Sequence, residues 1–163
     1  MKKLVFFLFI SLHVFSQDKS IFQNIEKLAS ETQRLVSVKK GEQIDTAAFR
    51  KLFLPTAHFT VVGVEEGKRI HETMSLNEFI KTLTDEYYSN GYFETSKGQV
   101  IEEYNGIAHV IASFYGEDSE GIKGYGINSY QLIYSDNRWW IANMVWTSSL
   151  DDGKDIPKKY WKN

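Results

Sequence analysis

The sequence predicts an α+β fold, a cone-shaped roll in which a strongly curved, mostly antiparallel sheet wraps over about three N-terminal helices. Three observations support this expectation. Apolar residues recur at helical spacing in three segments before residue 91, and from Tyr92 onward the chain reads as strands. Aromatic residues make up 15% of the chain, which suits a β-rich fold or an aromatic-lined cavity. No linker, repeat or charge block divides the 163 residues, so we expect one domain.

The first 16 residues have the order of features found in a secretory signal peptide. Two lysines precede an apolar run from Leu4 to Phe15, and the small residue Ser16 follows that run. The run is too short to span a bilayer stably. The alternatives to a signal peptide are a buried N-terminal strand and an uncleaved anchor. We therefore predict cleavage near Ser16–Gln17, export to the periplasm or the medium, and no membrane association afterwards. The domain would occupy residues 17–150, followed by a C-terminal tail at 151–163.

Composition excludes several classes of function. The chain has no cysteine, which removes disulfides, thiolate nucleophiles and thiolate metal sites. Loss of Lys2 and Lys3 with the leader leaves 17 of the 19 basic residues against 21 acidic ones. A mildly acidic domain without a basic cluster is a poor binder of nucleic acid or anionic membranes. No phosphate loop, serine-nucleophile motif or zinc helix is present, so we expect no cofactor.

Two helices are expected at the start of the domain. Ser20 opens a capping-box pattern, and the apolar stripe that follows runs to a basic turn and Gly41. Asp45 can cap a second, short helix whose apolar face extends to Phe53 and which Pro55 ends.

A strand pair should follow, from Ala57 through a turn at "EEGK" and back along "RIHETM". Ser75 and Glu78 then form a second capping box, which predicts a third helix that Asn90-Gly91 stops.

The chain from Tyr92 to Ser148 reads as four strands, with turns at Asn105-Gly106 and Asp136-Asn137 and a polar loop, "GEDSEGIKG", between the two hairpins. Placing Asp136-Asn137 at the last turn predicts these cross-strand pairs: Tyr134 with Trp139, Leu132 with Ile141, Tyr130 with Asn143, and Asn128 with Val145. A shift of one residue at this turn would exchange the two faces.

Five stretches carry a resemblance to a known superfamily: "FRKLFLPTAHF", "GYFE", "NGIAHVIASFY", "GINSYQL" followed by "NRWWI", and "IPKKY". In this order the chain resembles the nuclear transport factor 2-like superfamily, most of all its polyketide-cyclase-like (SnoaL-like) branch of exported bacterial proteins. The resemblance implies a sheet folded over helices, a cavity between them, and a homodimer through the outer face of the sheet. Many members carry an acid just before the alanine of "LFLPTA", where this chain has Thr56.

The same resemblance places the side of the last hairpin that carries Trp139 against the helices. That face would present Tyr130, Asn128 and Asn143 in an apolar setting, as groups that orient a ligand, with Trp139 and Tyr87 as walls. The alternative is that Tyr130 and Asn143 simply hydrogen-bond each other in the core.

Two residues are candidates for general acid–base chemistry. His58 is the best-placed base if it points inward from the first strand, and Glu94 of "GYFE" is the other candidate. The ordinary alternatives are a half-buried strand histidine and a glutamate that faces water. The alternation around His109 gives it a mixed face, which favours the outer surface. His58 and His71 should share a face, but their spacing matches no metal motif, so we expect no metal site.

Three functions are compatible with these residues. The first is an exported, dimeric protein that binds a small, mostly apolar molecule in an aromatic-lined cavity. The second is an isomerase, dehydratase or cyclase that uses His58 or Glu94 as general base in the same cavity, since the resemblance covers both catalytic and ligand-binding proteins. The third is a protein-interaction module that acts through the outer sheet face.

Overall fold

The computed structural model describes residues 19–148 and 156–161. The predicted signal peptide and its cleavage site lie outside these residues. The helices are α1 (Lys19–Phe22), α2 (Ile25–Val36), α3 (Thr46–Arg50), α4 (Leu76–Thr82), α5 (Glu86–Ser89) and the 3₁₀ helix η1 (Lys158–Tyr160). The strands are β1 (Phe53–Glu65), β2 (Lys68–Ser75), β3 (Tyr92–Tyr104), β4 (Ile107–Asp118), β5 (Lys123–Ser135) and β6 (Arg138–Ser148).

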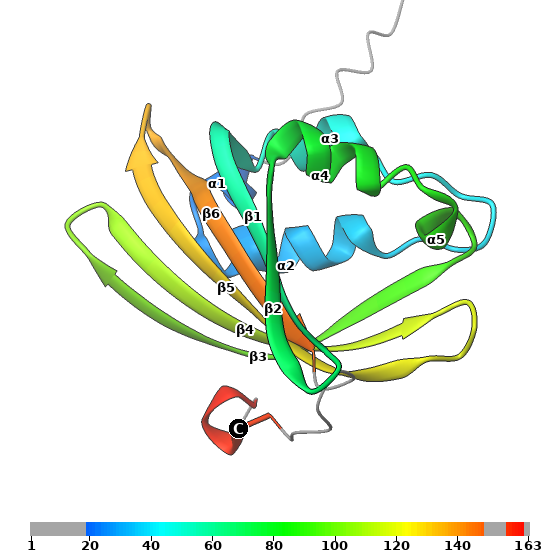
Figure 1. Ribbon diagram of the computed structural model, residues 1–163. Helices are drawn as coiled ribbons and strands as arrows, with labels where there is room; N and C mark the ends of the chain where they lie inside the picture. The colour runs from blue at the N-terminus through cyan, green and yellow to red at the C-terminus, as the bar shows by residue number, and fades with distance from the viewer. Residues whose placement is uncertain (1–18, 149–155, 162–163) are drawn as a thin grey trace, which may run out of the picture.

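The six strands form one sheet in the order β2-β1-β6-β5-β4-β3. Every neighbouring pair is antiparallel except β1 and β6, which run parallel. Helices α2, α3 and α4 lie over one face of this sheet, and the opposite face carries the C-terminal segment (Figure 1). The predicted α+β class and mostly antiparallel sheet are therefore confirmed. No helix in the described part of the chain has the length and apolar character needed to cross a bilayer.

The helix starts follow local capping. Asn24 Oδ1 accepts from the backbone N–H of Lys27 at 2.8 Å and starts α2, so the predicted long helix from Ser20 is instead two helices. Asp45 accepts from the N–H of Ala48 at 2.8 Å, which confirms the second cap. That helix is shorter than predicted, because Phe53 already belongs to β1.

The third predicted helix begins as expected but ends early. Both bonds of the Ser75–Glu78 capping box are present. The helix stops at Thr82, and the short α5 follows, so the predicted single helix up to Asn90 is wrong. After this break, the two tyrosines of α5 pack against Tyr92 at the start of β3.

Both predicted hairpin turns are confirmed. Asn105 and Gly106 have φ values of 47° and 83°, and Asp136 and Asn137 have φ values of 50° and 59°. Two consecutive residues with positive φ make the tight turn whose twist matches paired strands.

The predicted register of the last hairpin is correct near the turn and wrong farther from it. Leu132 pairs with Ile141 as expected, but a β-bulge at Ala142 then shifts the ladder, so that Gln131 pairs with Asn143. One extra residue exchanges the faces beyond it. The predicted pairing of Tyr130 with Asn143 is therefore wrong, because Tyr130 pairs with Met144. As a result, Met144 turns inward and Asn143 turns to the outer face.

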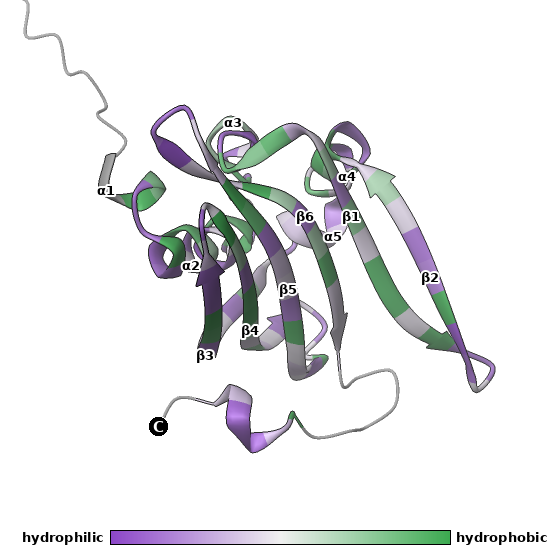
Figure 2. Cartoon of the chain, turned by 90° about the vertical axis from the view of Figure 1, so that its left-hand side faces the viewer, coloured by the Kyte–Doolittle hydropathy of each residue, from purple (hydrophilic) through white to green (hydrophobic). Residues whose placement is uncertain are grey.

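The core lies between the inner face of the sheet and the helices. Its aromatic centre, here termed the phenylalanine cluster, consists of Phe49, Phe53, Phe59 and Phe79. Edge strand β2 is largely hydrophilic, whereas β4, inside the sheet, is largely hydrophobic (Figure 2). A polar edge strand lowers the tendency of the open edge to pair with another chain.

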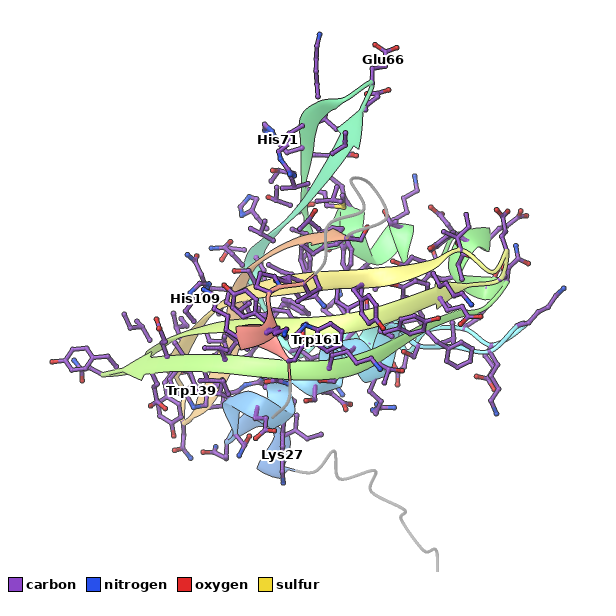
Figure 3. The ribbon with its side chains drawn as sticks, turned by 90° about the horizontal axis from the view of Figure 1, so that it is seen from below. Lys27, Glu66, His71, His109, Trp139 and Trp161 are labelled. Carbon is purple, nitrogen blue, oxygen red and sulfur yellow. The ribbon has the colours of Figure 1, made fainter. Side chains whose placement is uncertain are left out.

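The outer face carries His109, as its alternation predicted. Its Nε2 lies 2.9 Å from Ser129 Oγ, on the side of the sheet away from the helices. Figure 3 looks onto this face, where Trp161 of the C-terminal segment also lies. The Ser113 hydroxyl donates to the Tyr160 carbonyl, and the Trp161 ring meets Tyr125 edge-on at 5.0 Å. The segment 156–161 therefore covers part of the outer face.

Candidate functional site

A partly enclosed cavity of about 250 Å³ lies between the inner face of the sheet and helices α2, α4 and α5. Aromatic side chains form much of its wall: Phe49, Phe79, Tyr87, Tyr88, Tyr92, Phe114, Tyr130 and Trp146. Few polar groups share this space, and the most enclosed of them gather around Glu94 of β3. Such a composition is typical of small-molecule sites.

Glu94 is held by neighbours on three elements. The Tyr92 hydroxyl donates to Glu94 Oε1 at 2.9 Å, and Asn128 Nδ2 makes a longer bond of 3.5 Å to Oε2. On α2's side, the backbone N–H of Glu94 donates to Ser37 Oγ at 2.9 Å, which fixes this part of β3. Burial raises the pKa of Glu94 to about 7, against the lowering effect of its two side-chain hydrogen bonds.

A directed chain of hydrogen bonds holds Tyr130. Thr32 Oγ1 donates to the Ala29 carbonyl at 2.7 Å, so the proton in the 2.6 Å bond between Thr32 Oγ1 and Tyr130 Oη comes from the tyrosine. The Tyr130 oxygen then accepts from Asn128, whose Nδ2 also faces Glu94. Asn128 Oδ1 has no hydrogen-bond partner among the described residues. Residues of α2, β5 and β3 are thus linked through polar atoms inside an apolar wall.

Three rings, here termed the tyrosine cluster, stand beside Glu94: Tyr87, Tyr88 and Tyr92. Their ring centroids lie 5.2–5.7 Å apart, with Tyr87 and Tyr88 almost perpendicular at 89°. Burial raises the pKa values of all three phenols, and the charge of Glu94 adds to the effect. Tyr87 is 50% exposed and stands at the mouth, where its hydroxyl bonds to Asp118.

Two glycines leave space for aromatic side chains that line the cavity. A Cβ at Gly126 would lie 2.2 Å from the Phe114 ring, and one at Gly116 would lie 3.2 Å from the Tyr92 hydroxyl. The absence of side chains at these positions lets Phe114 lie across β5 and lets Tyr92 reach Glu94.

Four of the predicted site residues line the cavity: Tyr130, Asn128, Tyr87 and Glu94. The strand alternation places Tyr130 and Asn128 inward, as expected from the hairpin turn, because both lie on β5, where the bulge of β6 does not alter which way side chains point. Glu94 reaches the cavity because it lies two residues after Tyr92 at the start of β3, and both side chains point toward α5.

The other predicted residues lie elsewhere. Asn143, displaced by the bulge, donates to Gln131 at 3.2 Å and accepts from the backbone N–H of His58 at 3.3 Å on the outer face. His58 is exposed and does not point inward, since Ala57 and Phe59 take the inner face of β1. Trp139 is buried but packs on Tyr134 at 5.3 Å, outside the cavity lining.

His58 and His71 share one face, as predicted, but three residue pairs lie between them in the ladder of β1 and β2. The Thr60 and Thr73 hydroxyls meet between them at 2.9 Å. No cluster of three or more potential metal ligands occurs in residues 19–148 or 156–161.

Sequence reasoning missed Tyr92, Tyr88, Thr32, Met144 and Trp146, all of which line the cavity. Period-two alternation from Glu94 could have found Tyr92. No local sequence pattern predicts the bulge that brings Met144 and Trp146 to the inner face in place of Asn143 and Val145.

Comparisons with solved structures agree with this architecture. A protein described as nuclear transport factor 2-like with a cystatin-like fold, from Novosphingobium aromaticivorans, matches with a TM-score of 0.61 and 12% identity, over 80% of this chain and 81% of that one. The fold is nuclear transport factor 2-like. A proposed scytalone dehydratase from the same organism matches with a TM-score of 0.58 and 13% identity, over 82% and 87% of the two chains.

A protein of unknown function with a cystatin-like fold, from Nostoc punctiforme, matches with a TM-score of 0.54 and 12% identity, over 76% of this chain and 87% of that one. No family model matches the sequence, and no curated protein matches it. At such low identity the similarity shows the fold alone, and it confirms the predicted fold. The polyketide-cyclase-like branch stays a prediction.

Proposed function

We propose that this protein binds a small, mostly apolar molecule in the cavity. The observation that carries the proposal is a partly enclosed aromatic space whose most enclosed polar atoms converge on one point, at Glu94, Asn128 and Tyr130. Apolar walls supply affinity, and a few placed polar groups supply orientation. The volume of about 250 Å³ lies just below the roughly 300–1,000 Å³ usual for drug-sized ligands, which favours a molecule about the size of one substituted ring.

The test is native mass spectrometry of the chain from residue 17 onward, purified after expression with its leader. A mass above that of the denatured chain identifies a retained ligand, and Glu94→Gln should weaken its retention while the exposed Glu103→Gln on the same strand should not. A ligand that binds equally well to both variants would place its site outside this cavity.

A second candidate function is proton transfer, of the isomerase or dehydratase type, with Glu94 as general acid and base. The specific observation in its favour is the pKa of about 7, which leaves both protonation states of Glu94 populated at neutral pH. Tyr92 and Asn128 would hold the carboxyl while its proton moves. His58 lies on the outer face and has no part in this proposal.

Deuterium uptake tests this candidate without knowledge of the natural substrate. A panel of small cyclic ketones incubated in D₂O should gain deuterium next to the carbonyl with the protein and should not with Glu94→Gln. Uptake that persists in the variant would rule out Glu94 as the base.

We also propose that the protein acts outside the cytoplasm and forms a homodimer through its outer sheet face. The leader-like first 16 residues support export, and the exposed side chains of Tyr104, Ile107 and Val145 support an interface. N-terminal sequencing of the protein from the cell envelope or medium tests the first, with Gln17 as the expected start. Sedimentation tests the second, and Ile107→Asp should convert a dimer to a monomer. A monomeric wild type would leave the outer face to a different protein partner.

A further inference from the structure

The charges around the cavity are of one sign. Glu94 lies in its wall, and Asp118 and Glu120 lie close enough to Tyr87 to raise the pKa of that phenol. The Glu117 carboxylate accepts from the Tyr115 hydroxyl at 3.1 Å on the outer face and does not add to these charges. None of the described residues that line the cavity is a lysine, arginine or histidine. Lys123 lies opposite Glu117 in the ladder of β4 and β5, outside the lining. A negative potential inside a low-dielectric wall favours a cationic ligand.

The aromatic wall has the same electrostatic preference. The face of each tyrosine or tryptophan ring carries the negative part of its quadrupole, so an ammonium group near these faces is attracted. The tyrosine cluster presents rings in nearly perpendicular orientations, at 89° between Tyr87 and Tyr88 and 75° between Tyr88 and Tyr92. Such rings can face one cationic group from different sides, and the carboxyl of Glu94 lies beside them, bonded to Tyr92.

We propose that the ligand of this cavity is a small organic cation, an amine or quaternary ammonium compound with an apolar body, whose charged group lies between Glu94 and the tyrosine cluster. This inference rests on the proposed binding function and names its ligand class. The apolar body would lie against Phe79, Phe114 and Trp146, which line the rest of the space.

The ionisation of Glu94 explains why a cation should bind more tightly than a neutral molecule of the same shape. In the empty cavity, burial disfavours the ionised carboxylate, and no cation in the described lining compensates for it. A bound cation supplies the missing charge, so binding and ionisation of Glu94 support each other. A neutral molecule of the same shape fills the same apolar space but lacks this pairing.

The experiment uses two probes of equal shape. Phenyltrimethylammonium and its neutral isostere tert-butylbenzene are titrated separately into the chain from residue 17 onward, with tryptophan fluorescence as readout, since Trp146 lines the cavity. We expect the cation to bind about tenfold more tightly or better, given the size of cation–π and ion-pair contributions. Glu94→Gln should bring the two affinities close together by weakening the cation alone. Glu103→Gln, an exposed acid on the same strand and outside the lining, is the matched control and should change the ratio by less than about twofold.

The pH dependence gives a second readout. The groups that face Glu94 are the phenols of Tyr92, Tyr87, Tyr88 and Tyr130, whose raised pKa values keep them neutral, and the amide of Asn128. Because the quaternary probe does not titrate, its affinity should rise from about pH 5.5 to about pH 8 as Glu94 ionises, and the rise should be lost in Glu94→Gln.

Three outcomes of this experiment would contradict the proposals. If tert-butylbenzene binds as tightly as the cation, the cationic ligand class is wrong while the proposed binding function stands. If the cation does not bind up to millimolar concentration and tert-butylbenzene does not bind up to its solubility limit, both proposals fail together. If the cation binds more tightly but Glu94→Gln leaves the ratio unchanged, the charged group lies elsewhere and the proposed position is overturned.

Discussion

Two aromatic clusters, formed by residues of the helices and of the sheet, differ by a hydroxyl group on each ring. In the phenylalanine cluster the members are at most 5% exposed, and Phe59 and Phe79 stack at 4.4 Å. In the tyrosine cluster the rings are 5.2–5.7 Å apart, and Tyr87 is half exposed. Phenyl rings can close a core completely. Buried phenols need polar hydrogen-bond partners, which here are Glu94 and Asp118. The tyrosines therefore pack less tightly, and the cavity lies beside these polar groups.

The largest expected effect lies in the phenylalanine cluster. Phe59→Ala removes a fully buried ring from the centre of the core and should lower the free energy of unfolding by about 3–5 kcal/mol. Tyr87→Ala, in the other cluster, should cost less than about 1 kcal/mol because half of that side chain is already in water. Urea denaturation of the two variants measures the contrast. Equal costs would mean that the tyrosine cluster is part of the core.

The next effect concerns Glu94 and pH. Its folded pKa of about 7 lies above the usual 4.5, so the folded state resists ionisation. The wild type should therefore be most stable below pH 4.5 and lose up to about 3 kcal/mol as pH rises to about 7, at about 1.4 kcal/mol per pKa unit. Glu94→Gln should remove this loss, and Glu103→Gln on the exposed part of β3 should retain it. The slope of unfolding free energy against pH is the measured quantity. A variant with the wild-type slope would contradict the raised pKa.

A smaller effect is expected at Tyr130. Tyr130→Phe removes the bond to Thr32 and an acceptor for Asn128, which should cost about 1–2 kcal/mol. Tyr134→Phe, whose exposed hydroxyl bonds to Asn137 at 3.0 Å, should cost less than about 0.5 kcal/mol. Thermal or urea unfolding separates the two. If both changes cost the same, the buried hydrogen-bond chain contributes nothing.

The smallest effect is at Asn143. Because this side chain lies on the outer face, Asn143→Ala should leave the affinity for a cavity ligand unchanged, whereas Met144→Ala, one residue on, should weaken it severalfold through lost packing. Titration of whichever probe binds gives both values. A loss of affinity in Asn143→Ala would show that the β-bulge at Ala142 is misplaced.

Local chemistry explains which parts of the fold could be predicted. The Ser75–Glu78 capping box, the Asp45 cap and both two-residue turns depend on neighbours along the chain, and each was predicted. The β-bulge depends on contacts between β5, β6 and β1, which no local pattern encodes.

Local sequence pattern also explains which residues of the site could be predicted. The inward faces of Tyr130 and Asn128 follow from alternation near a well-defined turn. The packing of α5 against the start of β3 places tyrosines beside Glu94. It depends on the break between α4 and α5 and could not be predicted from residue spacing.

The parallel pairing of β1 with β6 also constrains how the molecule folds. These two strands lie side by side in the sheet, yet residues 66–137, which include the other four strands, separate them along the chain. The pairing of β1 with β6 therefore cannot form until the last strand is present. Contacts between residues so far apart in the sequence slow folding. During synthesis β1 and β2 would remain a separate hairpin until β6 has emerged, so completion of the core is a late, post-synthetic event.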